Sequence, residues 1–354
     1  LADKPTPEYI RSLREHLTDV WSKTHTDWEK RDSYYFQTFA LWPPEMKGRT
    51  EIHHARPRQI VNSAVDHQVA FNPKPHRFPA GEGEEHKERA DRVEQYLHAV
   101  LEETALLETA LTWKQVGKHL VHLGYAVVEG PVLDVRERPP KPARRGEADQ
   151  EYENRLVLWE NEKKVWMPFR IRVPHPARVL LNPEEKRPRF AVKHASWYSG
   201  DLHEQTMKRK KRRRRDVSVW DVDADPFALV MCDEYWTREW HVLVAVQGED
   251  GNYSGMKRMG DDESGMLFIE KNPFGFVPFD HAFAGWGLEP TTEDRNDPVY
   301  LAEGILSGSM DTIKLETQEM AAEHNLIIQT AYDPLVTSED AEELAAQMAK
   351  GDYV

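Results

Sequence analysis

The spacing of apolar residues changes near Gly124, and this change restricts what the chain can fold into. Before Gly124, apolar side chains recur at steps of three, four and seven residues, which is the spacing of one helix face. After Gly124, short runs of strand-forming residues alternate with clusters of Gly, Pro and Asp. The sequence therefore predicts an α+β fold. The predicted helices cover 7–39, 57–72, 82–101 and 107–123, and the predicted antiparallel strands cover 125–128, 166–173, 190–198, 227–236 and 239–246.

Two further segments have a predicted structure of their own. Residues 136–164 combine a stretch rich in Pro and Arg with a helix from Glu147 to Lys164, and we interpret this piece as an insertion. From Pro298 to His324 apolar residues recur at helical spacing without an internal proline. We expect one helix there, roughly 40 Å long at about 1.5 Å per residue. A strand at 326–332 and a short helix ending near Lys350 should follow it.

Composition excludes several classes of protein. The 354 residues are enough for about two domains, and 47 Lys and Arg against 61 Asp and Glu give a net charge of −14. This charge argues against a protein that coats a phosphate backbone through general positive charge. Cys232 is the only cysteine, so no intrachain disulfide can form and a reducing compartment is favoured. No run of 18 apolar residues and no secretory leader pattern is present, so no membrane contact is expected.

Motifs for nucleotide and metal chemistry fail at specific positions. The sequence contains neither a phosphate-binding loop of the Walker type nor a Gly-x-Gly-x-x-Gly turn. Asp221, Asp223 and Asp225 have the spacing of a calcium loop, but Pro226 and Cys232 stand where a Gly and a bidentate Glu are needed. His119 and His122 share a predicted helix face without a third ligand at a diagnostic spacing. We therefore expect no cofactor and no resident metal, and we expect Cys232 to be a packing residue.

The most concentrated charge is a run of eight basic residues that follows a short predicted helix at 201–207. Self-repulsion among these side chains predicts an exposed segment. The run could contact phosphate groups or dock on an acidic partner surface, and it could equally be a flexible tract neutralised by the acidic residues that follow. The run consists of Lys208, Arg209, Lys210, Lys211, Arg212, Arg213, Arg214 and Arg215.

A resemblance to a known family comes from the order of elements after residue 267. An Asn-x-x-Gly-x-Val-Pro-Phe element is followed by a short loop and then by the helix predicted from Pro298. This order resembles that of the portal (head-to-tail connector) proteins of tailed double-stranded-DNA bacteriophages. The strand at 125–128 after the helices of 82–123, the segment 171–179 and the pair Trp236-Thr237 are similar to parts of the portal wing. The residues of the element are Asn272, Gly275, Val277, Pro278 and Phe279.

The resemblance implies a portal-like architecture. Residues 1–296 would form a helical and antiparallel-β wing that contains the insertion at 136–164, residues 297–324 a long first stem helix, and residues 325–354 the start of an α/β clip. The second stem helix and the crown of portal proteins would be absent from this chain. The resemblance also implies a non-enzymatic homo-oligomeric ring of twelve subunits at one capsid vertex of the virion, assembled in the host cytoplasm.

Such a ring would be a conduit for double-stranded DNA during packaging and ejection, without sequence specificity. Its partners would be the terminase motor, a head-tail adaptor and the major capsid protein. A net negative subunit suits a channel that must not grip phosphate groups. The candidate tunnel-lining carboxylates are Glu303, Asp311, Glu316, Glu319 and Glu323, and the basic run at 208–215 is the candidate contact with capsid or DNA. A metal-dependent nucleic-acid-processing enzyme and a head-tail adaptor ring stay open as alternatives.

Overall fold

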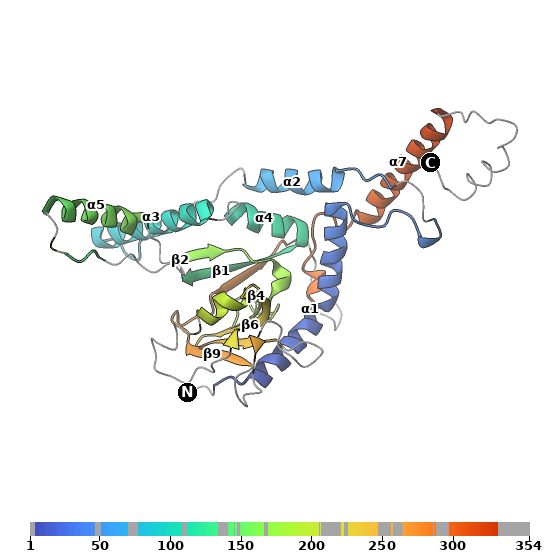
Figure 1. Cartoon of the computed structure of the whole chain (residues 1–354). Helices are drawn as coiled ribbons and strands as arrows, with labels where there is room; N and C mark the ends of the chain where they lie inside the picture. The colour runs from blue at the N-terminus through green and yellow to red at the C-terminus, as the bar shows by residue number, and fades with distance from the viewer. Residues whose placement is uncertain are drawn as a thin grey trace.

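The computed structural model joins two antiparallel sheets to the long helix α1 and to further helices, of which α2 and α4 contact α1. It describes residues 4–46, 51–69, 77–107, 112–133, 141–144, 146, 149–165, 169–204, 206, 221–222, 226–246, 256–257, 265–285, 287 and 297–331. Helix α1 runs down one side of the sheets, and α2 and α4 cover their upper end (Figure 1). The structure confirms the α+β class with antiparallel pairing.

The helices α1 and α2 begin and end within three residues of the predicted positions, whereas α3 extends six residues beyond its predicted end and α4 begins five residues after its predicted start. The bounds are α1 (Pro7–Phe36), α2 (Arg56–Val69), α3 (Glu84–Leu107) and α4 (Thr112–Leu123). Thr6 caps α1, since its side chain accepts a hydrogen bond from the backbone N–H of Tyr9, and a proline occupies the first helical position. Gly124 has a φ of +76° and ends α4 in the left-handed conformation that favours glycine.

The strands form a three-stranded sheet in the order β10-β1-β2 and a five-stranded sheet in the order β3-β4-β6-β7-β9. Every pairing in both sheets is antiparallel. β5 and β8 pair separately. The bounds are β1 (Tyr125–Leu133), β2 (Phe169–Arg172), β3 (Val179–Leu180), β4 (Phe190–Tyr198), β5 (Asp221–Val222), β6 (Leu229–Thr237), β7 (Trp240–Ala245), β8 (Met256–Lys257), β9 (Met266–Lys271) and β10 (Phe279–Phe283).

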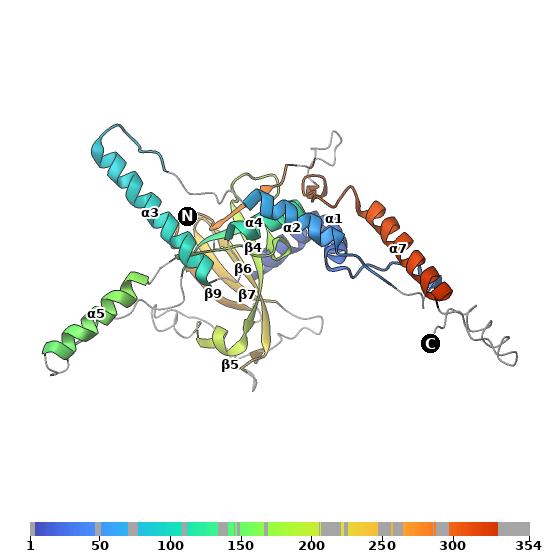
Figure 2. The ribbon, with the colours of Figure 1, turned by 90° about the horizontal axis from the view of Figure 1, so that it is seen from above.

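The remaining elements connect these layers or project from them. Helix α5 (Asp149–Val165) matches the helix predicted inside the insertion, and residues 199–204 are helical near the predicted 201–207. Figure 2 shows α3 and α5 extending from the body in different directions. Three short 3-10 helices are η1 (Pro44–Met46), η2 (Pro176–Arg178) and η3 (Pro298–Tyr300), and the last described helix is α7 (Met310–Ala331).

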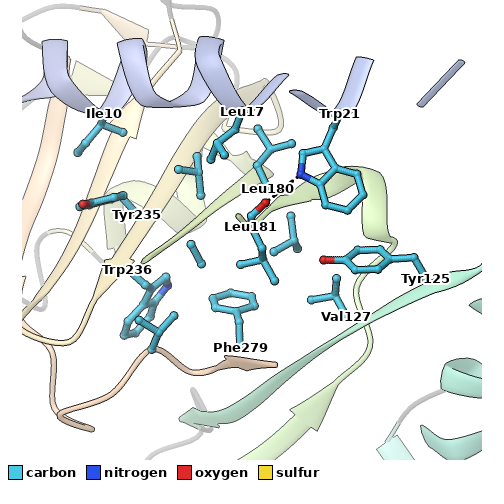
Figure 3. Packing of buried hydrophobic residues seen from close by; sticks show 14 of the residues in the cluster. Ile10, Leu17, Trp21, Tyr125, Val127, Leu180, Leu181, Tyr235, Trp236 and Phe279 are labelled. Atoms are coloured by element: carbon cyan, nitrogen blue, oxygen red, sulfur yellow. Dashed lines mark hydrogen bonds between the residues drawn. The ribbon is translucent and has the colours of Figure 1, made fainter. Parts of the chain in front are cut away.

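The main hydrophobic core lies between α1 and the two sheets (Figure 3). Ile10, Leu17 and Trp21 project from α1 onto residues of both sheets. The Trp21 indole N–H donates to the carbonyl oxygen of Leu181 at 2.9 Å, so the aromatic ring is buried without leaving its polar atom unsatisfied. Tyr125 at the start of β1 packs on Trp21, with ring centres 4.8 Å apart. This core fixes α1 relative to both sheets.

The Asn272 to Phe279 element has a structural explanation. The side-chain amide of Asn272 donates to the carbonyl oxygens of Thr237 and Phe276 at 2.6 and 2.7 Å, and its oxygen accepts from the backbone N–H of Phe274. Gly275 has a φ of +70°, which favours glycine. Phe279 is buried in the main core. The element is therefore a turn that returns the chain from β9 to β10.

The helix predicted from Pro298 to His324 is wrong at its start, and the strand predicted at 326–332 is wrong over its described part. The chain forms η3, then a series of turns, and α7 begins only at Met310. Helix α7 then continues to Ala331, through the residues expected to be a strand. Its 22 residues correspond to about 33 Å. The rest of the predicted clip and its helix near Lys350 lie outside the described residues.

Candidate functional site

Helix α7 leaves the body on the side opposite α3 and α5 (Figures 1 and 2). One face of α7 is buried by its own chain through Met310, Ile313, Thr317 and Ala321, which recur at steps of three and four residues. These residues pack against the segment that follows α1 and against α2, in a second hydrophobic cluster. From Ala322 to Ile327 five of the six side chains are exposed. Helix α7 is therefore enclosed by its own chain only along one face of its first half.

The predicted stem carboxylates do not share one environment. Glu303 precedes α7 and lies in the turn segment, where it is exposed. The carboxylate of Glu316 forms an ion pair with the guanidinium of Arg56 at 2.8 Å, and this pair links α7 to the start of α2. Asp311, Glu319 and Glu323 lie on exposed positions of α7. The helix therefore presents an acidic outer face of three carboxylates, while the other two predicted residues have different positions.

Leu315 lies on the same outer face of α7. Its side chain is 60% exposed, although it sits between the exposed carboxylates Asp311 and Glu319 along the helix. The outer face is therefore acidic with an apolar residue in its middle. A helix in this position can bury Leu315 only against another molecule or another part of the chain.

The turn segment before α7 is held against the end of α4. The backbone N–H of Ile305 donates to the carbonyl oxygen of Val121 at 2.8 Å, and the N–H of Gly304 donates to the hydroxyl of Ser307 at 3.0 Å. A Cβ atom at Gly304 would lie 2.0 Å from the carbonyl oxygen of His122. This close approach explains why the predicted helix does not run on from Pro298: at Gly304 and Ile305 the backbone lies against the end of α4, and the segment closes short turns such as Ser307 N–H to the Gly304 carbonyl instead of a continuous helix.

Arg31 joins this turn segment to the body. Its guanidinium is 1% exposed and donates to the carbonyl oxygens of Leu123 and Ala302, both at 2.7 Å. It also contacts the carboxylate of Asp27, one turn earlier on α1. Burial lowers the pKa of Arg31, and Asp27 opposes that shift by stabilising the charged form. Helix α1, the end of α4 and the approach to α7 therefore meet at one buried cation.

A charged cluster bridges the two sheets and was not predicted from the sequence. The ammonium of Lys193 on β4 donates to both carboxylate oxygens of Glu129 on β1 at 2.8 Å and lies 3.6 Å from Glu234 on β6. The ring nitrogens of His241 on β7 face carboxylate oxygens of Glu234 at 2.8 Å and Glu270 at 3.1 Å. Each ring nitrogen of His241 therefore has a carboxylate oxygen as its partner.

The two carboxyl groups that Lys193 contacts have pKa values shifted in opposite directions. Burial raises the pKa of Glu129, and the charge of Lys193 only partly opposes this shift. Burial also disfavours the ionised form of Glu234, but the hydrogen bond from His241 and the charge of Lys193 outweigh it and lower its pKa to about 2. A cavity of about 470 Å³ opens over the cluster between the sheets. The polar groups of the cluster bond to one another, so we assign the cluster the role of holding the two sheets together.

Several histidines gather where α1, α4 and the segment before η2 meet. His119 and His122 come from α4, and the rings of His119 and His175 are 5.7 Å apart. His122 is hydrogen-bonded to Asp32 at 2.7 Å. Burial, followed by the charge of His175 and Lys118, lowers the pKa of His119 to about 4. Burial likewise lowers the pKa values of His25 and His175. The structure brings in His25 and His175, which sequence spacing did not connect with the α4 pair.

The other predicted features have the following positions. The basic run at 208–215 and Asp223 and Asp225 lie outside the described residues. Cys232 is fully buried among apolar side chains, as expected, and burial raises the pKa of its thiol. Within the described part of the chain, no group of three or more His, Cys, Asp or Glu side chains is arranged to hold a metal ion. No helix among the described residues has both the length and the apolar content needed to span a bilayer.

Neither a protein-family model nor a curated protein matches the chain. Assignment to the portal family is therefore a proposal, which rests on the residues and the geometry described above.

Proposed function

We propose that this chain is a subunit of a portal ring, a non-enzymatic conduit for DNA at one capsid vertex. The observation that carries the proposal is α7, which projects from the body with one face buried by its own chain and an outer face that is acidic around the exposed Leu315. Copies of the subunit arranged about an axis would cover Leu315 by a heterologous contact that closes into a ring. In this arrangement α7 is the stem, although it begins at Met310 rather than at Pro298.

The charge of the outer face agrees with a channel through which DNA slides. Asp311, Glu319 and Glu323 would border the contact over Leu315, and where they face the channel they would repel phosphate groups only weakly at the ionic strength of a cell, because exposed charges are screened over about 8 Å. Basic residues at these positions would release counterions and hold DNA. The α1–sheet core and the ionic bridge between the sheets would form the wing that supports α7. The terminase, adaptor and major capsid protein remain the proposed partners, in a virion assembled in the host cytoplasm.

Electron microscopy of the purified full chain tests this proposal. We expect rings of about twelve copies with a central opening when particles are viewed along the symmetry axis. Leu315→Glu places a charge on the outer face of α7 and should give monomers that unfold at the wild-type temperature. Leu158→Glu is a matched control, because Leu158 is 62% exposed and lies far from α7 on α5.

Particles without rotational symmetry, or a Leu315→Glu variant that still forms rings, would contradict the assignment of α7 as the stem. Metal-dependent cleavage of DNA that a single carboxylate substitution abolishes would instead favour the nucleic-acid-processing enzyme. A ring that binds an assembled head only after DNA packaging would favour the head-tail adaptor.

A further inference from the structure

A cavity of about 330 Å³ lies between the end of α1, helix α2 and helix α4. Figure 2 shows α2 lying alongside α4 and crossing above α1. The volume of the cavity is at the lower end of the range for small-ligand pockets. The residues that line this α2–α4 pocket are Tyr35, Arg58, Asn62, Val65, Asp66, Lys114, Gln115 and Lys118.

Two cations of the α2–α4 pocket lie over the same aromatic ring. The guanidinium carbon of Arg58 is 5.9 Å from the centre of the Tyr35 ring, and the Lys118 ammonium is 4.8 Å from it. Tyr35 is 2% exposed and forms a fixed base for both side chains. The ring attracts each cation, but the two like charges repel one another. An anion placed between them would relieve that repulsion.

The only carboxylate of the pocket is already engaged. Asp66 accepts an ion pair from Lys114 at 2.7 Å. Within the described residues, neither Arg58 nor Lys118 has a carboxylate at ion-pair distance. Among the described residues, the pocket therefore has two positive charges without an ion-pair partner, in a chain whose net charge is −14.

The remaining polar side chains that line the pocket include further donors. The Tyr35 hydroxyl donates to the side-chain oxygen of Asn62 at 3.1 Å, which orients the Asn62 amide and leaves its NH₂ group for another acceptor. Gln115 contributes a second amide from α4. A planar guanidinium, two ammonium groups and two amide NH₂ groups around one small cavity match the several acceptor oxygens of a phosphate group.

We propose that the α2–α4 pocket binds a phosphate group, held by Arg58 and Lys118 over Tyr35 and by the amides of Asn62 and Gln115. The phosphate is either a free ion or a phosphodiester of DNA. This site stands on its own observations and does not depend on ring formation. It also differs from the acidic outer face of α7, because it offers a localised contact for one phosphate group.

The experiment titrates the full-length chain with inorganic phosphate and separately with a short DNA duplex. Binding is followed by isothermal titration calorimetry and by the NMR shifts of the Asn62 and Gln115 side-chain amides. Chloride at equal ionic strength is the reference for the phosphate titration. Arg58→Gln combined with Lys118→Gln should weaken phosphate binding about tenfold or more, since it removes both uncompensated charges. Asp66→Asn should strengthen binding, because it releases Lys114 towards the pocket.

The matched control is Arg56→Gln, which removes one positive charge from α2 two residues from Arg58. Arg56 pairs with Glu316 and does not line the pocket, so its variant should bind phosphate like the wild type. Phosphodiester binding is the source if DNA also shifts both amides and Arg58→Gln lowers the salt slope of DNA affinity by about one. Phosphate binding without DNA binding identifies free phosphate as the source.

Two outcomes would overturn the proposal. One is equal phosphate binding by the wild type and the Arg58→Gln, Lys118→Gln variant. The other combines two results: the wild type binds neither phosphate nor DNA, and the Arg58→Gln, Lys118→Gln variant no longer forms oligomers. These results together would assign the two cations to a contact with an acidic surface of a second copy. Ring images of the wild type are unaffected by the first outcome, so failure of this site and failure of the ring are distinguishable.

Discussion

The guanidinium of Arg31 and the carbonyl oxygen of Ala302 are 2.7 Å apart, although 271 residues separate them along the chain. The same Nη1 atom donates to Leu123 at 2.7 Å. Both acceptors are backbone oxygens at ends of chain segments, where carbonyl groups lack helical partners. One buried side chain thus completes the hydrogen bonding of the α4 terminus and of the approach to α7.

Arg31→Met should lower the free energy of unfolding by about 3 to 5 kcal/mol, because it removes the donor to the buried Ala302 carbonyl, leaves the Leu123 carbonyl with Trp28 as its side-chain donor, and leaves Asp27 without its cation. Urea unfolding followed by tryptophan fluorescence measures this loss. Arg189→Met is the control, since Arg189 is 84% exposed and its ion pair with Glu185 is worth little. Equal losses for the two variants would show that Arg31 does not organise the junction.

Gly304→Ala should destabilise the protein by about 1 to 3 kcal/mol, because its Cβ would lie 2.0 Å from the carbonyl oxygen of His122 and would push the turn segment off α4. Gly308→Ala is a matched control in the same segment, with no atom within 4 Å of its Cβ. It should be neutral or stabilise by about 0.4 to 1 kcal/mol by restricting the unfolded chain. Thermal unfolding of both variants gives the comparison, and a larger loss for Gly308→Ala would contradict the structure.

The bridge between the sheets predicts a coupled pair of substitutions. Lys193→Met should cost about 3 to 5 kcal/mol, since it leaves Glu129 and Glu234 buried without their shared cation. Adding Glu129→Gln to Lys193→Met should recover part of this loss. A double-mutant cycle in urea should therefore give a coupling energy of about 0.5 to 3 kcal/mol. Additive losses would mean that the two side chains do not interact.

Acid should destabilise the protein through His119. Burial lowers the pKa of His119 to about 4 in the folded state, against 6.5 in the unfolded chain. Between these values the unfolded state binds more protons, so stability is full above about pH 6.5 and falls by up to about 3 kcal/mol as the pH drops towards 4. Unfolding curves of His119→Gln between these pH values should show a smaller slope. His16→Gln, at an exposed position of α1, should keep the wild-type slope.

If the chain is a portal subunit, as proposed, the basic run gives a prediction at the level of the virion. Replacing residues 208–215 with Gln should reduce particle assembly or the amount of packaged DNA, because it removes eight adjacent positive charges. Replacing the Arg residues of the run with Lys keeps the charge and should preserve both. Phage titre and DNA content per particle are the measurements, and unchanged titres with the Gln variant would remove the hypothesis.

Local patterns predicted most of the helices and strands of the described chain. Strand β4 has the predicted bounds, and α1 and α2 begin and end within three residues of the predicted positions, because proline and the alternation of apolar residues act on neighbouring positions. Gly124 was recognised as the end of α4 for the same local reason. The α+β class with antiparallel pairing follows from these elements.

Contacts between distant segments decided what the sequence did not predict. The residues 298–309 have no proline after Pro298 and look helical, but a hydrogen bond from Ile305 to Val121 and the close approach of Gly304 to His122 hold them in turns. The Lys193 cluster joins five strands, so no spacing along the chain reveals it. Two glycines and two serines at 304, 307, 308 and 309 were the available signal for a break before α7.

The hydrogen bonds from Arg31 to Leu123 and Ala302 also restrict the order in which the chain can fold during its synthesis. The direction of α7 depends on a backbone oxygen at Ala302 that must reach a side chain made 271 residues earlier. A nascent chain can pair the strands of both sheets before that point, but it cannot complete either hydrophobic cluster or orient its projecting helix until the later segment has emerged. In the proposed ring, subunits would therefore associate only late in their synthesis.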